Sequence, residues 1–122
     1  MILMHRVLIG TIFYCLLSSI GFGKEVKATL DLTKGLAPLS QQIIKVNKND
    51  VVRLVISSDE PGDLHLHAYH LSVHLDPKMK SVLDFKAFAT GRFTFEWHSG
   101  IRSSLPQMSH QKALATLEVF PE

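Results

Sequence analysis

Residues 24–122 are predicted to form an all-β domain, a sandwich or barrel of about seven short strands. Apolar and polar residues alternate in several short segments, most clearly in "VKATLDL" (26–32), where Val, Ala, Leu and Leu share one face. Turn signals such as "NKND" and "DEPGD" separate these segments, at a spacing of roughly 8–12 residues that is typical of sandwiches and barrels. No convincing helical period appears between them.

The expected strands follow one another along the chain with polar, Gly-containing or Pro-containing turns between them. After the first strand, Gly35 and Pro38 break the chain. In "TGRFTFEW", alternation places Phe93, Phe95 and Trp97 on one face. The remaining expected strands cover 42–46, 51–57, 64–75, 81–87, 90–97 and 113–120.

The N-terminal stretch has the layout of a secretory signal. A positive charge at Arg6 precedes the apolar run 7–20, and small residues follow at Gly21 and Gly23. We therefore expect a signal peptide over residues 1–23, cleavage before Lys24, and a mature domain of residues 24–122 in the bacterial periplasm. An uncleaved membrane anchor is the alternative, but the run is shorter than the roughly 20 apolar residues that a spanning helix needs.

Composition excludes several classes of function for the mature domain. Without Arg6, the 13 Lys and Arg residues fall to 12, against 11 Asp and Glu, so we expect no nucleic acid partner and no stable membrane insertion. The single cysteine, Cys15, lies in the signal. The mature domain is therefore expected to have no disulfide, no thiolate ligand and no thiol nucleophile.

Four histidines occur in the thirteen residues "DLHLHAYHLSVHL". On a strand, His65 and His67 point to the same side, with Cα atoms about 6.6 Å apart, and two such imidazoles can converge on one metal ion. His70 and His74 occupy positions that suit ordinary surface residues.

The apolar residues of this stretch change phase near Ala68. Leu64 and Leu66 are even-numbered, whereas Leu71 and Val73 are odd-numbered. One strand buries both sets only if it contains a bulge or bend. We expect Leu64 and Leu66 to face the core, which turns the His65 and His67 side chains outward or toward a loop cavity at the end of the domain.

A second group of candidate ligands lies near the end of the chain. His98 follows the aromatic strand, and Met108 and His110 close the loop "SGIRSSLPQMSH". A strand end and the loop that leaves a neighbouring strand can meet in a sandwich. The candidate metal ligands are therefore His65, His67, His98, His110 and Met108. Met108 could instead pack as an ordinary loop residue.

The segments "SSDEPGDLHLHAY", "ATGRFTFEWH" and "LATLEV" resemble those of small bacterial cupredoxin-like domain proteins, over about residues 43–121. The resemblance implies a cupredoxin-like Greek-key β-sandwich of about seven strands. It also implies one ligand, His65 or His67, after an early core strand, with the other ligands in the loop 97–110. Copper is the metal that the resemblance implies, and zinc also suits imidazole ligands.

The sequence departs from the blue-copper pattern because the loop 97–110 contains no cysteine. This excludes the trigonal His₂Cys site and the binuclear oxidase site. Two readings remain open. One is a histidine-ligated, non-blue copper-binding protein for metal handling or delivery, with a possible periplasmic protein partner. The other is a metal-free cupredoxin-fold binding or accessory module.

Enzyme motifs are weak in this chain, and we expect no enzymatic activity. "HLHAYH" is one residue from the H-x-H-x-D-H metal motif of metallo-β-lactamase-like hydrolases, but Tyr69 stands in the Asp position and the chain is too short for that fold. The cupin motif requires a Glu soon after H-x-H, and none follows His67. No G-x-S-x-G elbow surrounds Ser103 and Ser104.

Overall fold

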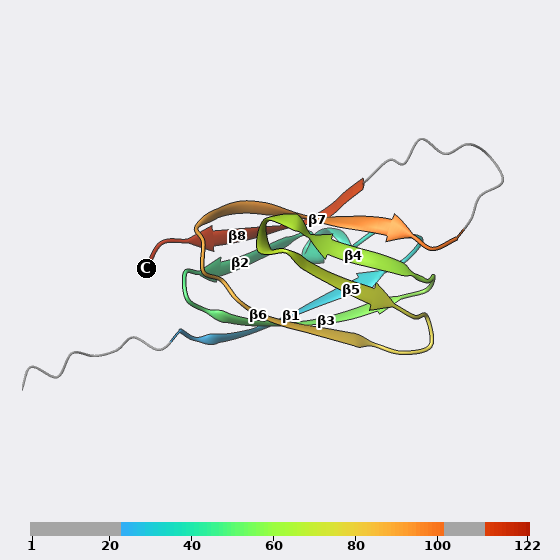
Figure 1. The fold of residues 1–122 in the computed structure, drawn as a ribbon, viewed down its shortest axis with the longest axis horizontal. Coiled ribbons are helices and arrows are strands. Elements are labelled where there is room, and N and C mark those ends of the chain that lie inside the picture. The colour runs from blue at the N-terminus through green and yellow to red at the C-terminus, as the bar shows by residue number, and fades with distance from the viewer. Residues whose placement is uncertain (1–22, 102–111) are drawn as a thin grey trace, which may run out of the picture.

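The computed structural model describes residues 23–101 and 112–122. Within these ranges the chain forms eight strands and two short 3₁₀ helices (Figure 1). The elements are β1 (Glu25–Leu32), η1 (Leu39–Gln41), β2 (Ile43–Asn47), β3 (Val51–Ser58), β4 (Gly62–Leu66), η2 (His67–Tyr69), β5 (Leu71–Leu75), β6 (Ser81–Lys86), β7 (Gly91–Ser99) and β8 (Lys112–Phe120).

The strands form two sheets that face each other across one core. The smaller sheet has the order β1-β3-β6, and the larger sheet has the order β2-β8-β7-β4-β5. Figure 1 shows the two sheets as separate layers. β1 pairs in parallel with β3, and β2 pairs in parallel with β8. The chain therefore crosses repeatedly between the sheets, and the all-β Greek-key sandwich expected from the sequence is confirmed.

The core consists of the inward-facing residues of both sheets. β3 alternates strictly, so that Val52, Leu54 and Ile56 are fully buried between more exposed neighbours. Phe95 and Trp97 face inward from β7, as the alternation of the aromatic segment predicts. The alternation that defines this core also fixes which side chains lie on the outer faces.

The histidine stretch differs from the expected single strand over 64–75. It forms a β-hairpin, in which β4 and β5 pair antiparallel across the 3₁₀ turn η2. The reversal occurs at His70, whose backbone is left-handed with φ of 53°. The phase change in the apolar pattern therefore marks a chain reversal and not a bulge. This hairpin accounts for the count of eight strands in place of seven.

The described part of the chain holds no helix with the length and apolar run that a membrane crossing requires. The expected signal peptide lies outside the described residues, except for Gly23.

Candidate metal centre on the outer face of the larger sheet

The candidate site lies on the outer face of the larger sheet, where β4 and β7 run side by side. In this antiparallel pair, His65 is opposite Glu96, and Asp63 is opposite His98. Opposite residues in such a pair point to the same face. The residues between them face the core and are at most 7% exposed: Leu64, Leu66, Phe95 and Trp97. The site is therefore held in place by the packed core beneath it.

Three side chains bring metal-binding atoms together at this position. His67, Glu96 and His98 each offer one ligand atom, and these atoms lie within 4.8 Å of one another. His67 Nε2 is 2.7 Å from Glu96 Oε2. The side chain of His67 is 58% exposed and that of Glu96 is 24% exposed, so the cluster opens to solvent on one side.

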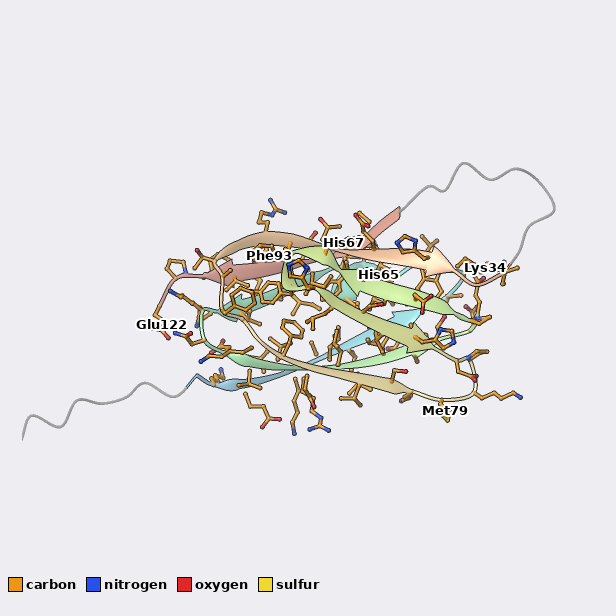
Figure 2. The ribbon with its side chains drawn as sticks, in the orientation of Figure 1. Lys34, His65, His67, Met79, Phe93 and Glu122 are labelled. Atoms are coloured by element: carbon orange, nitrogen blue, oxygen red, sulfur yellow. The ribbon has the colours of Figure 1, made fainter. Side chains whose placement is uncertain are left out.

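His65 lies against both histidines of this cluster. Its ring stacks on that of His67, with centroids 5.5 Å apart and planes at 7°. It also meets the ring of His98 edge-on, with centroids 4.5 Å apart. Figure 2 labels His65 and His67 as neighbours on the larger sheet. The site thus combines three imidazoles and one carboxylate.

His98, a member of this cluster, has a ring nitrogen without a hydrogen-bond partner. Among the described residues, its Nε2 is the one buried side-chain nitrogen or oxygen without a hydrogen-bond partner. A buried polar atom left without a partner costs free energy, so native structures rarely contain one. A metal ion bound to this nitrogen would give it the partner that it lacks.

A β-bulge lies beside the cluster, on the side of β8. Phe95 pairs with Ala115, but the next residue, Glu96, pairs with Ala113, so Leu114 is the extra residue. Bulges bend a strand locally and are common next to functional sites. Here the bulge places a small, exposed residue, Ala113, next to the Glu96 carboxylate.

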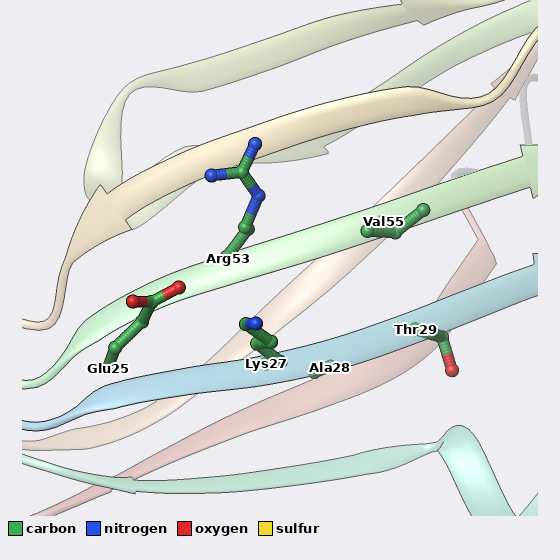
Figure 3. A pocket seen from close by; sticks show the side chains of 6 residues that line it. All are labelled: Glu25, Lys27, Ala28, Thr29, Arg53 and Val55. Atoms are coloured by element: carbon green, nitrogen blue, oxygen red, sulfur yellow. The ribbon is translucent and has the colours of Figure 1, made fainter.

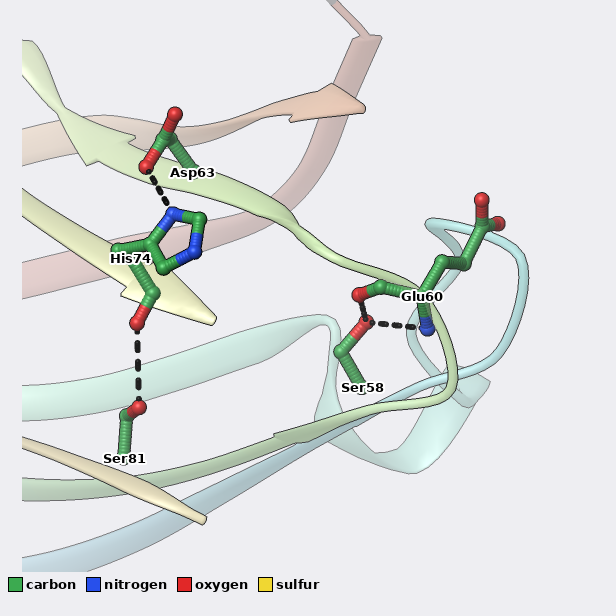
Figure 4. Close-up of polar contacts among 5 residues, drawn as sticks. All are labelled: Ser58, Glu60, Asp63, His74 and Ser81. Carbon is green, nitrogen blue, oxygen red and sulfur yellow. Dashed lines mark hydrogen bonds and ion pairs between the residues drawn. The ribbon is translucent and has the colours of Figure 1, made fainter. Parts of the chain in front are cut away.

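A second histidine–carboxylate pair lies on the adjacent edge of the same face. His74 Nδ1 is 2.9 Å from Asp63 Oδ1, and Ser81 Oγ donates to the His74 carbonyl oxygen at 3.2 Å (Figure 4). His74 and His70 are both exposed, as expected for surface residues. Neither belongs to the three-residue cluster.

The structure brings together three of the residues that the sequence indicates as ligands: His65, His67 and His98. It adds Glu96, which sequence reasoning missed. A signal for Glu96 was present, because residues 96 and 98 alternate with Phe95 and Trp97 and must share the outer face. The other two candidates, Met108 and His110, lie outside the described residues.

A shallow pocket on the other sheet has a different character. It lies on the outer face of β1 and β3 and contains two cations and one carboxylate but no imidazole (Figure 3). Its lining residues are Glu25, Lys27, Ala28, Thr29, Arg53 and Val55. Side chains of this kind do not form a transition-metal site.

No protein-family model and no curated protein sequence matches this chain. Solved structures do resemble it. A copper-binding protein studied by NMR in its apo form has a TM-score of 0.59 and 13% identity, over 80% of this chain and 89% of that one. The periplasmic domain of cytochrome oxidase subunit II from Bradyrhizobium japonicum has a TM-score of 0.57 and 16% identity, over 79% and 84%.

A copper nitrite reductase from Nitrosomonas europaea also matches, with a TM-score of 0.58 and 18% identity. The match covers 81% of this chain but only 42% of the reductase. Identities this low establish the fold and leave the activity open. Together with the two sheets and their strand order, the likeness shows that the chain has the cupredoxin-like Greek-key β-sandwich fold.

Proposed function

We propose that this protein binds copper on the outer face of its larger sheet, with His67, Glu96 and His98 as ligands and His65 beside them. The observation that carries the proposal is the buried, unpartnered Nε2 of His98 in a cluster whose ligand atoms lie within 4.8 Å of one another. The cupredoxin-like fold, shared with copper-binding proteins, makes copper the favoured metal.

The donor set fits a divalent ion of borderline softness. Imidazole nitrogens and a carboxylate oxygen suit Cu(II) and Zn(II), whereas Cu(I) favours thiolate and thioether ligands. The one cysteine of the chain, Cys15, precedes the domain. Copper exceeds zinc in the affinity order of divalent first-row metals. We therefore expect Cu(II) to bind most tightly, and Zn(II) to bind more weakly.

The hydrogen-bonded pair of His67 and Glu96 would exchange its shared proton for the ion. Their atoms are now 2.7 Å apart, which is a hydrogen-bond distance. Ligands must release their protons to bind a metal, so His67 and Glu96 would give up this proton when they hold Cu(II). The negative charge of Glu96 offsets part of the charge of the ion.

The exposure of the site favours metal handling or delivery over catalysis. The side chain of His67 is more than half exposed. Substrate sites are concave and bury most of their ligand, whereas a face of this kind leaves the ion accessible to the ligands of a partner protein. We propose a metal-handling role with no enzymatic activity.

Export completes the proposal. The N-terminal pattern of Arg6, an apolar run and small residues supports a signal peptide over residues 1–23. The mature domain, residues 24–122, would then act in the periplasm. Cell fractionation together with N-terminal sequencing of the mature protein tests this part directly.

The binding experiment is a Cu(II) titration of the purified protein. Trp97 is the single tryptophan of the chain and lies between Glu96 and His98, so quenching of its emission reports binding. Electron paramagnetic resonance of the complex should show hyperfine coupling to nitrogen. His67→Ala and His98→Ala should each weaken binding at least about tenfold, because loss of even a residue that supports a metal ligand costs about 10–100-fold. His74→Ala serves as the control, since His74 lies on the same face but pairs with Asp63.

The titration also decides between the two readings left open by the sequence. One-to-one binding that requires residues 67 and 98 supports a histidine-ligated copper site. Weak binding that survives both substitutions, with Zn(II) and Cu(I) equally inert, would refute the proposal. The protein would then be a metal-free module whose partner must be sought among proteins.

A further inference from the structure

Tyr69, the last residue of η2, links the turn between β4 and β5 to the segment between β6 and β7. Its hydroxyl donates to the Ala89 carbonyl oxygen at 2.9 Å and accepts from the Ala89 N–H at 3.3 Å. The residue is only 6% exposed. Both hydrogen-bonding groups of one peptide segment are therefore satisfied by a single side chain.

The ring of Tyr69 is enclosed by three phenylalanines. Ring centroids lie 5.6 Å from Phe85, 4.5 Å from Phe88 and 5.1 Å from Phe93. Aromatic pairs at such separations contribute roughly 0.5–1.5 kcal/mol each beyond their buried area. Tyr69 is thus the anchor of η2 in the core.

The turn itself has little to hold it. η2 has three residues, and no side chain caps its start at Leu66. Its closing hydrogen bond runs from the N–H of His70, a residue in the strained left-handed region, to the His67 carbonyl oxygen at 2.9 Å. A single 3₁₀ turn is not stable alone, so its position depends on the packing of Tyr69.

His67, at the start of the same turn, cannot fix its own position. Its side chain is 58% exposed, and its partner is the partly exposed Glu96. Exposed ion pairs contribute roughly 0–1 kcal/mol. The other cluster residues, Glu96 and His98, are held by strand pairing within the sheet. His67 is the member of the site whose place depends on a turn.

We infer that Tyr69 is a positioning residue for the metal site, which holds the His67 imidazole in reach of Glu96 and His98 through the rigid turn η2. The inference rests on the copper site proposed above. Tyr69 is not itself a metal ligand in that site and acts through the backbone of residues 67–69. Loss of its hydroxyl frees Ala89 and loosens the turn, while the rest of the sheet keeps Glu96 and His98 in place.

Tyr69→Phe tests this inference with two measurements on the purified protein. Without metal, the nuclear Overhauser effect between the stacked rings of His65 and His67 should weaken. With Cu(II), the affinity should fall about tenfold, the scale on which supporting residues of metal sites act. In a His67→Ala background the same substitution should change the affinity less than about twofold, because coupled residues are not additive.

Controls separate positioning from general loss of stability. Val46→Ala, in the core of β2 away from the turn, should lower stability but leave the copper affinity unchanged. Phe88→Ala removes an aromatic partner of Tyr69 and should weaken copper binding without touching the hydroxyl. Phe120→Ala, another partly exposed phenylalanine, should not. The Phe88 and Phe120 pair gives the answer even if Tyr69→Phe fails to fold.

The possible failures are distinct. If the wild-type protein binds no Cu(II), the proposed metal site is refuted and the role of Tyr69 falls with it. If the wild-type protein binds Cu(II) and Tyr69→Phe and Phe88→Ala bind equally well, only the positioning role is overturned. An equal effect of Tyr69→Phe with and without the His67 imidazole also overturns it.

Discussion

Replacing His98 by phenylalanine should stabilise the metal-free protein and remove its response to copper. The perturbed atom is Nε2, which is buried and has no hydrogen-bond partner. An unsatisfied buried polar atom costs about 1–3 kcal/mol. Phenylalanine keeps a flat ring against His65 and removes the polar atom, but its larger ring reduces the gain. We expect a net stabilisation of about 1 kcal/mol at the low end of this range.

Copper should reverse the order of the melting temperatures of the wild-type protein and the His98→Phe variant. A gain of 1 kcal/mol raises the melting temperature of a domain of this size by about 4–8 °C. A ligand present at 100 times its dissociation constant stabilises the folded state by about 2.7 kcal/mol. The wild-type protein receives this stabilisation and the variant does not. Without copper the variant should therefore melt higher, and with copper the wild-type protein should melt higher.

Thermal unfolding followed by circular dichroism, with and without Cu(II), measures both effects. His74→Phe is the control, because His74 lies on the same face but its Nδ1 pairs with Asp63. The control should show no gain in stability and should keep the copper response. A metal-free His98→Phe protein that melts below the wild type would refute the reasoning, since Nε2 would then have a partner in solution.

Three further predictions follow from the structure. Gly62→Ala should destabilise the fold by about 1–3 kcal/mol in denaturant titrations, because a methyl group there would lie 2.5 Å from both the His98 carbonyl oxygen and the Trp97 ring; an unchanged midpoint would contradict this packing. Burial raises the pKa of the Tyr69 hydroxyl above its usual 10.0, so the folded state keeps this proton better than the unfolded chain. Stability should thus hold below pH 10 and fall as the pH rises through the folded-state pKa, and Tyr69→Phe should flatten that fall in unfolding midpoints measured against pH. Removal of metal with a chelator should leave a cooperative unfolding transition, because the core lies between the sheets and the site on an outer face; a chelated protein without such a transition would show that the metal is needed for folding.

The alternation of apolar and polar residues predicted most of the strands and the faces of their side chains. Because side-chain direction alternates along any strand, the sequence placed Leu64 and Leu66 inside and turned His65 outward. The same rule put Phe95 and Trp97 on one face, which the structure buries in the core. These are local properties, which each segment expresses whatever its neighbours are. The likeness of the quoted segments to cupredoxin-like proteins then indicated how the strands are arranged.

The hairpin of the histidine stretch required the tertiary structure. The phase change near Ala68 is compatible with a bulged strand and with a reversal, and the pattern alone does not separate them. The reversal is chosen by distant contacts: Tyr69 binds Ala89 through its hydroxyl, and β5 pairs with β4. Such contacts join residues far apart in the chain, so no local window contains them.

The sequence by itself determined that His65 points away from the core face of Leu64 and Leu66, that no thiolate is available in residues 24–122, and that imidazoles are the main candidate ligands. Only the tertiary structure decided that β4 and β7 are neighbours, with His65 opposite Glu96. That pairing made a carboxylate part of the site and left His98 Nε2 buried without a partner. The physical reason is that alternation fixes the face of each residue locally, whereas the partner of each strand is fixed by the burial of the whole core.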